Sequence, residues 1–480
     1  MSTAIILLLA FAASLFLSFL NLTLPYNLFT YVAATPTSLP EIGGRHPLPA
    51  AAFLVHFLTL FGFYLLAYRA CRQRPSARLV PLILACGLLL TLPLLLVYPI
   101  GAGDVVDYVS HGEVLAFFGV NPLVIPPADV PGTNLVHYSA YRYVPSNYGP
   151  LWTQISGLVV CVLGNHSLLL NLLGFKAVAI AAYLMEAVLI YAILRRRDPL
   201  FAPAGLLLFA WNPLVLYESA VNGHNDGMMM AFALLGFHFW ERERPLAMAA
   251  ALTLSFLVKI PTLPLLLLFL LAAACRRRQG WRFWFTLLSG GSLAAWLVAI
   301  AYLSLPDPWA ALTNLASRAD LFSQSLPTLV KLGLQTCGMR EGVAQDVARW
   351  GALLGLGGCA AVQAVRTWHA PTGVLAHAYD LYLFLLLFAT PWFQPWYVTW
   401  LVALAALRPR PHAPTQASLF SLTVLSSYVV FGFVWFWIPR FANWGHNLGI
   451  NLLAVLGTYT LPWAYTAWVW YRQRRASHER

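Results

Sequence analysis

Charged residues are scarce in this sequence. They make up 10% of its 480 residues, whereas a soluble domain carries about 25%. Hydrophobic residues make up 60%. A chain with so little charge cannot cover the surface of a soluble globule, so a soluble enzyme, a disordered protein, a coiled coil and a secreted disulfide scaffold are excluded. Repeated apolar runs, close to the roughly 20 residues that span a bilayer, predict an all-α, polytopic integral membrane protein.

The sequence also lacks the signatures of metal and nucleotide chemistry. Its six cysteines are scattered, without a CxxC pair or a metal-ligand spacing, and we interpret them as small buried hydrophobes. No P-loop, GxSxG, HExxH or GxGxxG motif occurs. We therefore expect no cofactor and no metal site, with a divalent cation left open as an alternative. The chemistry is expected at the membrane, where a donor embedded in lipid fits better than a nucleotide sugar.

The positive charge is placed in clusters. The net charge is +12, and short basic groups follow several apolar runs. Such groups are typical of cytoplasmic loops in membrane proteins and attract anionic lipid head groups. Nucleic-acid binding would need one contiguous basic face, so we expect membrane lipids, and no nucleic acid, among the partners. The clusters are Arg72, Arg74 and Arg78; Arg195, Arg196 and Arg197; Arg276, Arg277 and Arg278; and Arg472, Arg474, Arg475 and Arg480.

The apolar runs predict about 11–14 transmembrane helices in a single domain, residues 1–480, with both ends cytoplasmic. In this topology residues 99–166 form an outer loop with juxtamembrane helices, and residues 305–346 form a second outer loop. The apolar stretch 151–164 is short, so we place it along the outer surface. Long loops in compact domains are usually functional, and the first one is dense with polar and aromatic side chains.

Two helical hairpins are interrupted in the sequence. One break lies at Lys259-Ile260-Pro261, and the other at Pro391-Trp392-Phe393-Gln394-Pro395. Irregular backbone at membrane depth survives only where it is buried in protein or lines a wet cavity. The breaks therefore predict a site between helices near the outer side.

The first outer loop begins with two carboxylates. Asp104 and Asp107 are three residues apart and share one face of a helix. One of them could act as a general base toward a hydroxyl, or the pair could bind a divalent cation. The alternative without chemistry is that they interact with a helix N-terminus. The same loop supplies Tyr108, His111, Arg142 and Tyr148 as further candidates, with membrane-interface aromatics as the alternative for Tyr148.

A second polar cluster occupies the run from Glu218 to Gly227. We expect His224, Asn225 and Asp226 to bind a polar substrate, because ionisable residues at the membrane rim are functional candidates. A helix cap at Asp226 is the alternative, and the metal signal is weak.

Two further groups complete the candidate site. Lys259 is one of three lysines in the chain and lies at a helix break, where an unpaired cation would be costly. It needs a carboxylate of the first outer loop, or a phosphate, as its partner. Trp396, Tyr397 and Arg440 are expected on the same outer side, where aromatic faces suit a sugar ring or a lipid head group. An aromatic belt at the membrane interface is the alternative for the rings.

These motifs, taken in order, resemble those of GT-C glycosyltransferases. The resemblance is strongest to the bacterial polyprenyl-phosphate-mannose-dependent mannosyltransferases and covers about residues 100–400. It is carried by these segments: Asp104-Val105-Val106-Asp107-Tyr108, His111-Gly112, Gly119-Val120-Asn121-Pro122, Tyr148-Gly149-Pro150-Leu151-Trp152, Gly223-His224-Asn225-Asp226, Lys259 and Pro395-Trp396-Tyr397.

The resemblance implies inverting transfer of a hexose, with mannose preferred, from a polyprenyl-phosphate donor to a glycan or glycolipid acceptor. It implies Asp104 as the base, with Asp107 in reserve. Lys259, Arg142 and Arg440 are the candidates for the donor phosphate. Tyr108, His111, Tyr148, His224, Asn225, Asp226, Trp396 and Tyr397 are the candidates for substrate binding. The enzyme would lie in the cell membrane with its active site on the extracytoplasmic side.

A transporter or lipid-linked sugar flippase is the alternative function, because broken helices also mark transporters. A transporter site is expected near the midplane, where the sequence offers only Lys176, Glu186 and Asp380.

Overall fold

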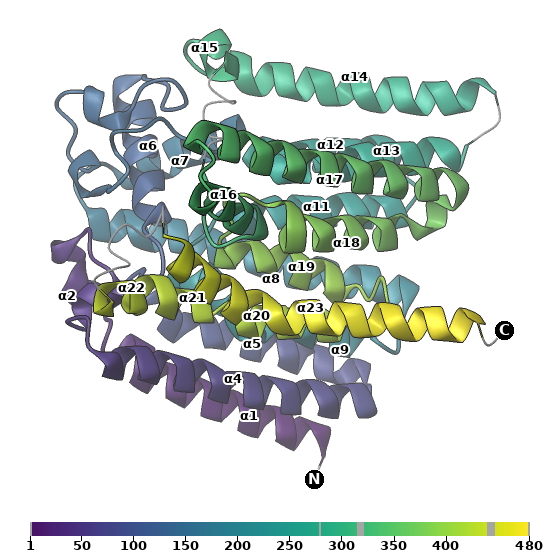
Figure 1. Ribbon diagram of the computed structural model, residues 1–480, viewed down its shortest axis with the longest axis horizontal. Helices are drawn as coiled ribbons and strands as arrows, with labels where there is room; N and C mark the ends of the chain where they lie inside the picture. The colour runs from purple at the N-terminus through teal and green to yellow at the C-terminus, as the bar shows by residue number, and fades with distance from the viewer. Residues whose placement is uncertain (1, 278–279, 314–320, 439–446, 479–480) are drawn as a thin grey trace.

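The computed structural model describes residues 2–277, 280–313, 321–438 and 447–478. Within these ranges the chain is helical, with two isolated β-bridges and no strand. The predicted all-α fold class is confirmed. The helices of the bundle lie side by side along one direction (Figure 1). They are α1 (Thr3–Ser18), α4 (Pro47–Gln73), α5 (Val80–Leu95), α8 (Leu168–Arg197), α9 (Ala202–Ala210), α11 (Asp226–Glu241), α12 (Pro245–Val258), α13 (Leu263–Cys275), α14 (Trp281–Leu303), α17 (Glu341–His369), α18 (Val374–Phe384), α19 (Val398–Ala406), α20 (Ala413–Thr423) and α23 (Leu448–His478).

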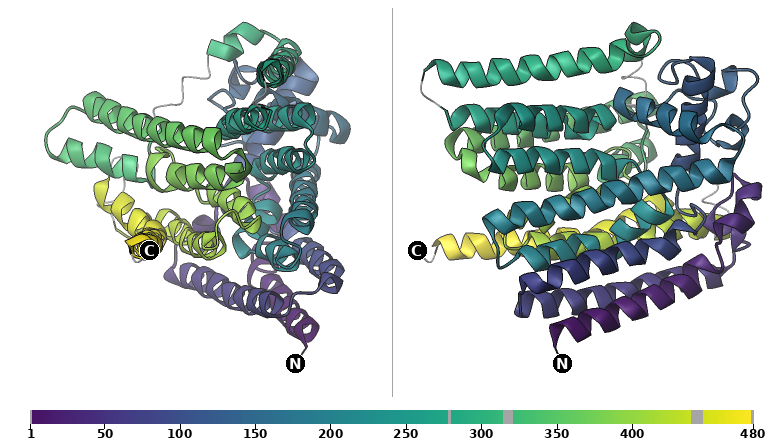
Figure 2. Two further views of the ribbon diagram at one scale, coloured as in Figure 1. Left: turned by 90° about the vertical axis from the view of Figure 1, so that its right-hand side faces the viewer. Right: turned by 180° about the vertical axis from the view of Figure 1, so that it is seen from behind.

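The two ends of the bundle differ in what they carry. At one end, on the left of Figure 1, lie the short helices and turns, with α6 (Asp104–Phe118) and α7 (Pro150–Leu163) among them. We call it the loop end. Both chain termini point toward the opposite end, which Figure 2 shows from two further sides. We call that one the arginine end, because Arg197 contacts Glu241 there and Arg408 contacts Asp198.

Seven of the described helices are long and apolar enough to cross a bilayer. The number is eight if Ala202–Ala210 and Pro213–Val221, bent by 48°, form one broken span. Shorter apolar helices include α7, α12 and Pro395–Ala406. The structure thus fits a multi-pass membrane protein, and the count of 11–14 crossings stays a prediction.

The exposed face of α14 shows the surface that lipid would cover. Trp284, Leu288 and Trp296 are 60–66% exposed on this one helix. A soluble protein rarely leaves so continuous an apolar face open to water. The pattern is that of a helix whose outer side lies against acyl chains.

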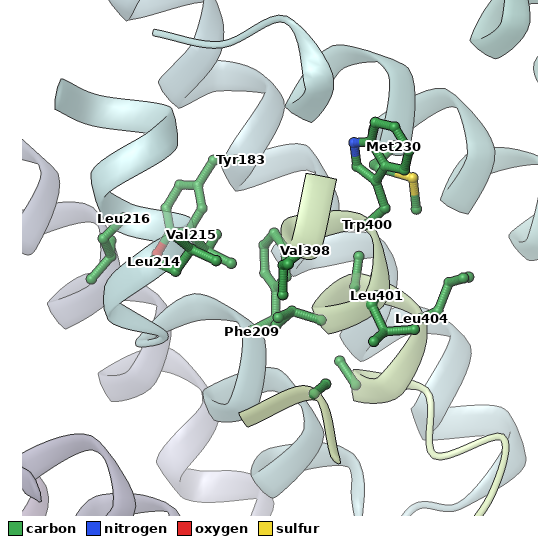
Figure 3. Packing of buried hydrophobic residues seen from close by; sticks show 14 of the residues in the cluster. Tyr183, Phe209, Leu214, Val215, Leu216, Met230, Val398, Trp400, Leu401 and Leu404 are labelled. Carbon is green, nitrogen blue, oxygen red and sulfur yellow. The ribbon is translucent and has the colours of Figure 1, made fainter. Parts of the chain in front are cut away.

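The core beneath the loop end is packed by aromatic and branched side chains. Figure 3 shows Tyr183, Phe209 and Val398 between α8, α9 and α19, with Trp400 beside Met230. These side chains are almost fully buried. Close packing of this kind fixes side chains in single rotamers. The residues where this core meets the loop end are therefore held rigidly.

Both predicted helix breaks are present. Helix α12 ends at Val258 and is followed by a 3₁₀ turn, Ile260–Thr262, before α13. The second break follows a π-helical turn, Leu385–Ala389, and ends in the 3₁₀ turn Pro395–Tyr397. The predicted outer loops also contain helices: α6 and α7 in the first, and α15 (Pro308–Thr313) and α16 (Leu326–Thr336) in the second. Helix α7 packs against α6, α8 and α12.

Candidate active site

Several segments that are distant in sequence meet at the loop end. Each is a place where a helix begins or ends, so the backbone can turn there and point side chains inward. The segments are the start of α6, residues 148–149, the turn 222–225, the break after α12, and residues 394–397.

Asp104 is the first residue of α6, in the first turn where an acidic side chain interacts favourably with the helix dipole. Its side chain is 18% exposed. The hydroxyl of Tyr148 donates a hydrogen bond to Asp104 Oδ2 at 3.0 Å. One carboxylate oxygen is thereby engaged, and the carboxylate stays accessible from one side.

The surroundings raise the pKa of the Asp104 carboxyl above its ordinary value. Burial is the main cause, and the neighbouring Asp226 carboxylate adds to the rise. The Lys259 ammonium and the hydrogen bond from Tyr148 act in the opposite direction. A carboxylate with increased proton affinity is a better general base than an ordinary aspartate.

Two glycines allow the segments to approach this closely. A Cβ on Gly149 would lie 2.0 Å from the carbonyl oxygen of Leu257, at the end of α12. A Cβ on Gly101 would lie 2.7 Å from Asn222 Nδ2. Instead, Gly149 N–H donates to the Val258 carbonyl at 2.9 Å, and Gly101 N–H donates to Asn222 Oδ1 at 3.1 Å. The glycines thus bring Tyr148 next to the helix break and Asp104 next to the 222–225 turn.

Lys259 and Asp226 form a buried ion pair. The ammonium lies 2.9 Å from Oδ2 and 3.1 Å from Oδ1, and the two side chains are 13% and 2% exposed. Trp400 Nε1–H also donates to Asp226 Oδ1 at 2.7 Å. The sequence predicted a carboxylate of the first outer loop, or a phosphate, as the partner of Lys259. The carboxylate that the structure provides comes instead from the polar run 218–227, because the turn before α11 packs against the break after α12.

Aromatic rings surround the Lys259 ammonium. It lies 5.2 Å from the centre of the Tyr397 ring, 5.8 Å from that of Tyr148 and 6.0 Å from that of Trp400. Rings at such distances attract a cation through their quadrupoles. The cation is therefore fixed in position and partly shielded from water.

His224 connects the two acidic parts of the site. Its ring stacks on Trp396 with centroids 4.0 Å apart. Nδ1 lies 3.6 Å from Asp104 Oδ2, and Nε2 lies 3.4 Å from Glu218 Oε2. Burial lowers the pKa of His224 well below its ordinary value, and the Lys259 ammonium acts in the same direction. The imidazole is therefore neutral.

Tyr108 and Asn225 lie below this surface. Tyr108 is buried against Tyr148 and Trp152, and its hydroxyl accepts a hydrogen bond from the Asn225 backbone N–H at 3.4 Å. Tyr108 therefore supports the site from underneath. The side-chain amide of Asn225 is buried, and neither of its polar atoms has a partner in the described part of the chain. Such a group is costly unless something bonds to it.

Two residues at the site were not among the sequence candidates. Glu218 stood in the polar run 218–227 but was given no role, and it accepts hydrogen bonds from Asn222 and Tyr428, both at 2.7 Å. Trp400 lies in the apolar helix Val398–Ala406. A carboxylate inside an otherwise apolar segment was the available signal for Glu218, whereas nothing in the sequence distinguished Trp400 from the many other tryptophans.

Three candidates are placed elsewhere, and a fourth is not described. The Asp107 carboxylate accepts a hydrogen bond from Ser139 inside the first loop. Arg142 donates to the backbone carbonyls of His137 and Ser139. His111 is buried, with its ring centre 6.3 Å from that of Tyr148. Arg440 lies outside the described residues. Their expected roles stay predictions.

The described residues contain no group of three or more His, Cys, Asp or Glu side chains placed to hold a metal ion. Asp226 is already bonded to Lys259 and Trp400, and Asp104 to Tyr148. The arrangement can abstract a proton, hold an anion beside an ammonium group and stack a flat apolar face on aromatic rings.

Comparison with known proteins gives two matches. Residues 9–276 match the family described as "Alpha-(1->6)-mannopyranosyltransferase, N-terminal domain". The chain is also 27% identical over 312 residues to the "Probable alpha-(1->6)-mannopyranosyltransferase" of Mycolicibacterium smegmatis (strain ATCC 700084 / mc(2)155). That alignment covers 56% of this chain and 53% of the relative, so the chain spans about half the relative's length.

Proposed function

Because the chain belongs to the alpha-(1->6)-mannopyranosyltransferase family, we propose that it transfers mannose, with inversion, from a polyprenyl-phosphate donor to a hydroxyl of a glycan or glycolipid acceptor. The observation that carries the proposal is Asp104, a partly exposed carboxylate of raised pKa, beside a fixed cation and a group of aromatic rings. The linkage would be the α-(1→6) bond for which the family is named.

Asp104 acts as the base. Its carboxylate takes the proton of the acceptor hydroxyl, and the acceptor oxygen attacks the anomeric carbon of the mannosyl group. The bond between that carbon and the phosphate oxygen breaks, and polyprenyl phosphate leaves as a monoester with one more negative charge. General-base catalysis contributes typically about 10²–10⁴-fold, and holding both substrates in one cavity supplies the orientation.

Lys259 is the cation for the donor phosphate. Its ammonium lies 2.9 Å from a carboxylate oxygen and is enclosed by three rings, so it is already oriented before the donor arrives. A fixed positive charge that stabilises the developing charge on the leaving group lowers the barrier. Arg142 and Arg440 remain further candidates for the same phosphate.

The aromatic and amide groups bind the sugars. The Trp396 and Tyr397 rings lie beside His224 and Lys259, respectively. Sugars present apolar C–H faces that pack on such rings. The buried Asn225 amide, which has no partner among the described residues, supplies a donor and an acceptor for a sugar hydroxyl.

The extracytoplasmic placement of the site is supported by the distribution of arginine. Helix α11 begins at Asp226, in the site, and ends at Glu241, which Arg197 contacts; α19 likewise begins beside residues 394–397 and ends at Ala406, just before Arg408. Positive charge accumulates in cytoplasmic loops. The loop end, with Asp104, is therefore proposed to face outward.

The transporter alternative receives less support. Two of its three midplane candidates are committed to structural contacts. Lys176 donates to the backbone carbonyls of Leu94, Leu95 and Val97, and Asp380 is bonded to Arg410.

The test is sugar transfer by the purified protein in lipid nanodiscs. Labelled polyprenyl-phosphate-mannose is the donor, and a membrane glycolipid extract is the acceptor pool. We expect label in glycolipid with the wild type and none with Asp104→Asn. An intact donor with wild-type protein would overturn the proposal, and a donor-binding assay would then show whether the lipid is bound without being used.

A further inference from the structure

A line of three side chains leads from the proposed base into the bundle. Asp104 Oδ2 lies 3.6 Å from His224 Nδ1, and His224 Nε2 lies 3.4 Å from Glu218 Oε2. His224 and Glu218 are 1% and 2% exposed, while Asp104 is 18% exposed. One neutral imidazole thus separates a deeply buried carboxyl group from the carboxylate that faces the substrate side.

The His224 ring lies between two carboxyl groups, Asp104 and Glu218, at distances just too long for hydrogen bonds. Neither nitrogen makes a hydrogen bond within the described part of the chain, and the ring is held flat against Trp396. Buried polar groups are nearly always bonded. The two carboxyl oxygens are a few tenths of an ångström beyond hydrogen-bond distance, and catalytic hydrogen bonds often shorten only when substrate binds.

The charges around this line do not balance if every acid is ionised. Asp104, Asp226 and Glu218 are three carboxyl groups, and Lys259, whose ammonium lies near them, is paired with Asp226. Two carboxylates on either side of a single imidazole repel each other, and burial adds a desolvation cost. The proton that relieves this repulsion belongs on Glu218, which is the more deeply buried of the two.

We infer that Glu218 is protonated in the active enzyme and fixes the His224 tautomer so that the imidazole donates to Asp104. Glu218 Oε2–H donates to Nε2, and Nδ1–H donates to Asp104 Oδ2. The second oxygen of Asp104 is then left for the acceptor hydroxyl. Glu218 and His224 are positioning residues, and this inference rests on the proposed role of Asp104 as the base.

The arrangement gives the site an alkaline limit. When Glu218 loses its proton, the His224 tautomer with the proton on Nε2 becomes favoured, because that N–H can donate to the new carboxylate. Nδ1 then has no proton and presents a lone pair to Asp104. A donor to the base is replaced by a repulsive contact, so activity falls as pH rises. The charged and titratable groups that face the pair are Asp104 from α6, Asp226 from α11, Lys259 from the break after α12, Tyr217 from the turn Tyr217–Val221, and Tyr428 from the helix Ser426–Val429.

The first test compares Glu218→Gln with Glu218→Leu. A glutamine amide can donate to Nε2 as the protonated acid does, but it cannot ionise. We expect Glu218→Gln to keep at least about a tenth of the wild-type kcat and to lose the alkaline decline. We expect Glu218→Leu to lose about 100-fold in kcat with little change in the KM of donor or acceptor, which is part of the roughly 10²–10⁴-fold that a general base supplies.

His224 offers a second matched pair. An asparagine places its amide nitrogen near the position of Nδ1, and a glutamine reaches the position of Nε2. We expect His224→Asn to retain about tenfold more activity than His224→Gln, because only the former can donate to Asp104.

Tyr428→Phe tests the inference without altering the line itself. The Tyr428 hydroxyl donates to Glu218 Oε1 at 2.7 Å and favours the ionised acid. Its removal is expected to move the alkaline decline to higher pH. Equal losses in Glu218→Gln and Glu218→Leu, or an alkaline decline unchanged in both Glu218→Gln and Tyr428→Phe, would overturn the inference. Activity in Asp104→Asn would instead overturn the proposed function, so the two failures are distinct.

Discussion

The two ends of the bundle hold their charges in different ways. At the arginine end, Arg408 and Asp198 are each 36% exposed, and Arg410 and Asp380 are 34% and 24% exposed. At the loop end, the groups that face each other are almost all buried. Lys259 and Asp226 are 13% and 2% exposed, and His224 and Glu218 are 1% and 2%.

This difference in burial suits two different tasks: exposed charges help to orient the protein in the membrane, and buried charges are typical of sites that carry out chemistry. Exposed pairs contribute little to stability and are screened by salt, yet their positive charge still biases the topology. Buried ionisable groups cost free energy and shift one another's proton affinities, which is characteristic of functional sites. Replacing charges at the two ends should therefore have effects of very different size and kind.

The largest effect is expected at Asp104. Asp104→Asn removes the proposed base while keeping the size of the side chain and a hydrogen-bond acceptor for Tyr148. We expect a loss of at least about 10²–10⁴-fold in kcat with unchanged thermal unfolding, measured in the nanodisc transfer assay. Asp107→Asn is the matched control, because Asp107 lies one turn along α6 and is bonded to Ser139. If Asp107→Asn lost as much kcat as Asp104→Asn, the assignment of the base would have to move.

Much of this site follows from the sequence. Ionisable residues in an apolar chain are rare, so Asp104, His224, Asp226 and Lys259 were recognisable one by one. The composition was enough to predict an all-α membrane fold, because so little charge leaves few other folds available. The helix breaks were marked by proline, which cannot continue a helix interior.

The pairings inside the site do not follow from the sequence. Tyr428 and Glu218 are 210 positions apart, and Trp400 and Asp226 are 174 apart. Nothing local sets such contacts; they arise when α19 and the helix Ser426–Val429 pack against the earlier part of the bundle. Trp400 is one apolar side chain in an apolar helix, so nothing in the sequence sets it apart. It contributes to the site through its indole N–H, which donates to Asp226. Asp107 is the opposite case. The spacing correctly placed it in the same helical turn as Asp104, but its carboxylate bonds to Ser139 in the first loop.

The second largest effect is expected from the buried ion pair. Lys259→Met leaves the Asp226 carboxylate buried without its cation, and breaking a buried pair in this way costs about 3–5 kcal/mol. The measurement is thermal or denaturant unfolding in detergent. The double variant Lys259→Met with Asp226→Asn should regain most of that stability, since no charge is then stranded, while transfer stays lost. A Lys259→Met protein as stable as the wild type would show that the pair is less buried than its exposed fractions indicate.

A smaller effect is expected on the acid side of the pH profile. The proposed base, Asp104, must be ionised, so activity should fall as pH drops through the pKa of its carboxyl group. Because burial raises that pKa, the decline should begin above the ordinary range of an aspartate. Tyr148→Phe removes a hydrogen bond that favours the ionised form, and we expect it to move the decline to higher pH.

The control for this shift is Tyr31→Phe. Tyr31 is the last residue of the short helix Leu28–Tyr31 and packs against Tyr98, so the variant loses a tyrosine hydroxyl outside the site. Its pH profile should match that of the wild type. A Tyr148→Phe decline that moved downward would mean that the hydroxyl favours the protonated form of Asp104.

The smallest effect is expected at the arginine end, where the comparison is sharpest. Arg408 lies 3.0 Å from Asp198, nearly the separation found between Lys259 and Asp226. The two ion pairs have similar separations and differ in burial. If separation alone set the energy of an ion pair, removing either cation would cost a similar free energy of unfolding. Water screens the exposed pair, and we expect Arg408→Gln to change the free energy of unfolding by at most about 1 kcal/mol and to leave kcat unaltered. A loss of about 3 kcal/mol or more in the same unfolding assay would show that the exposed pair contributes as much as the buried one. Burial would then no longer distinguish the end proposed to carry the chemistry from the other.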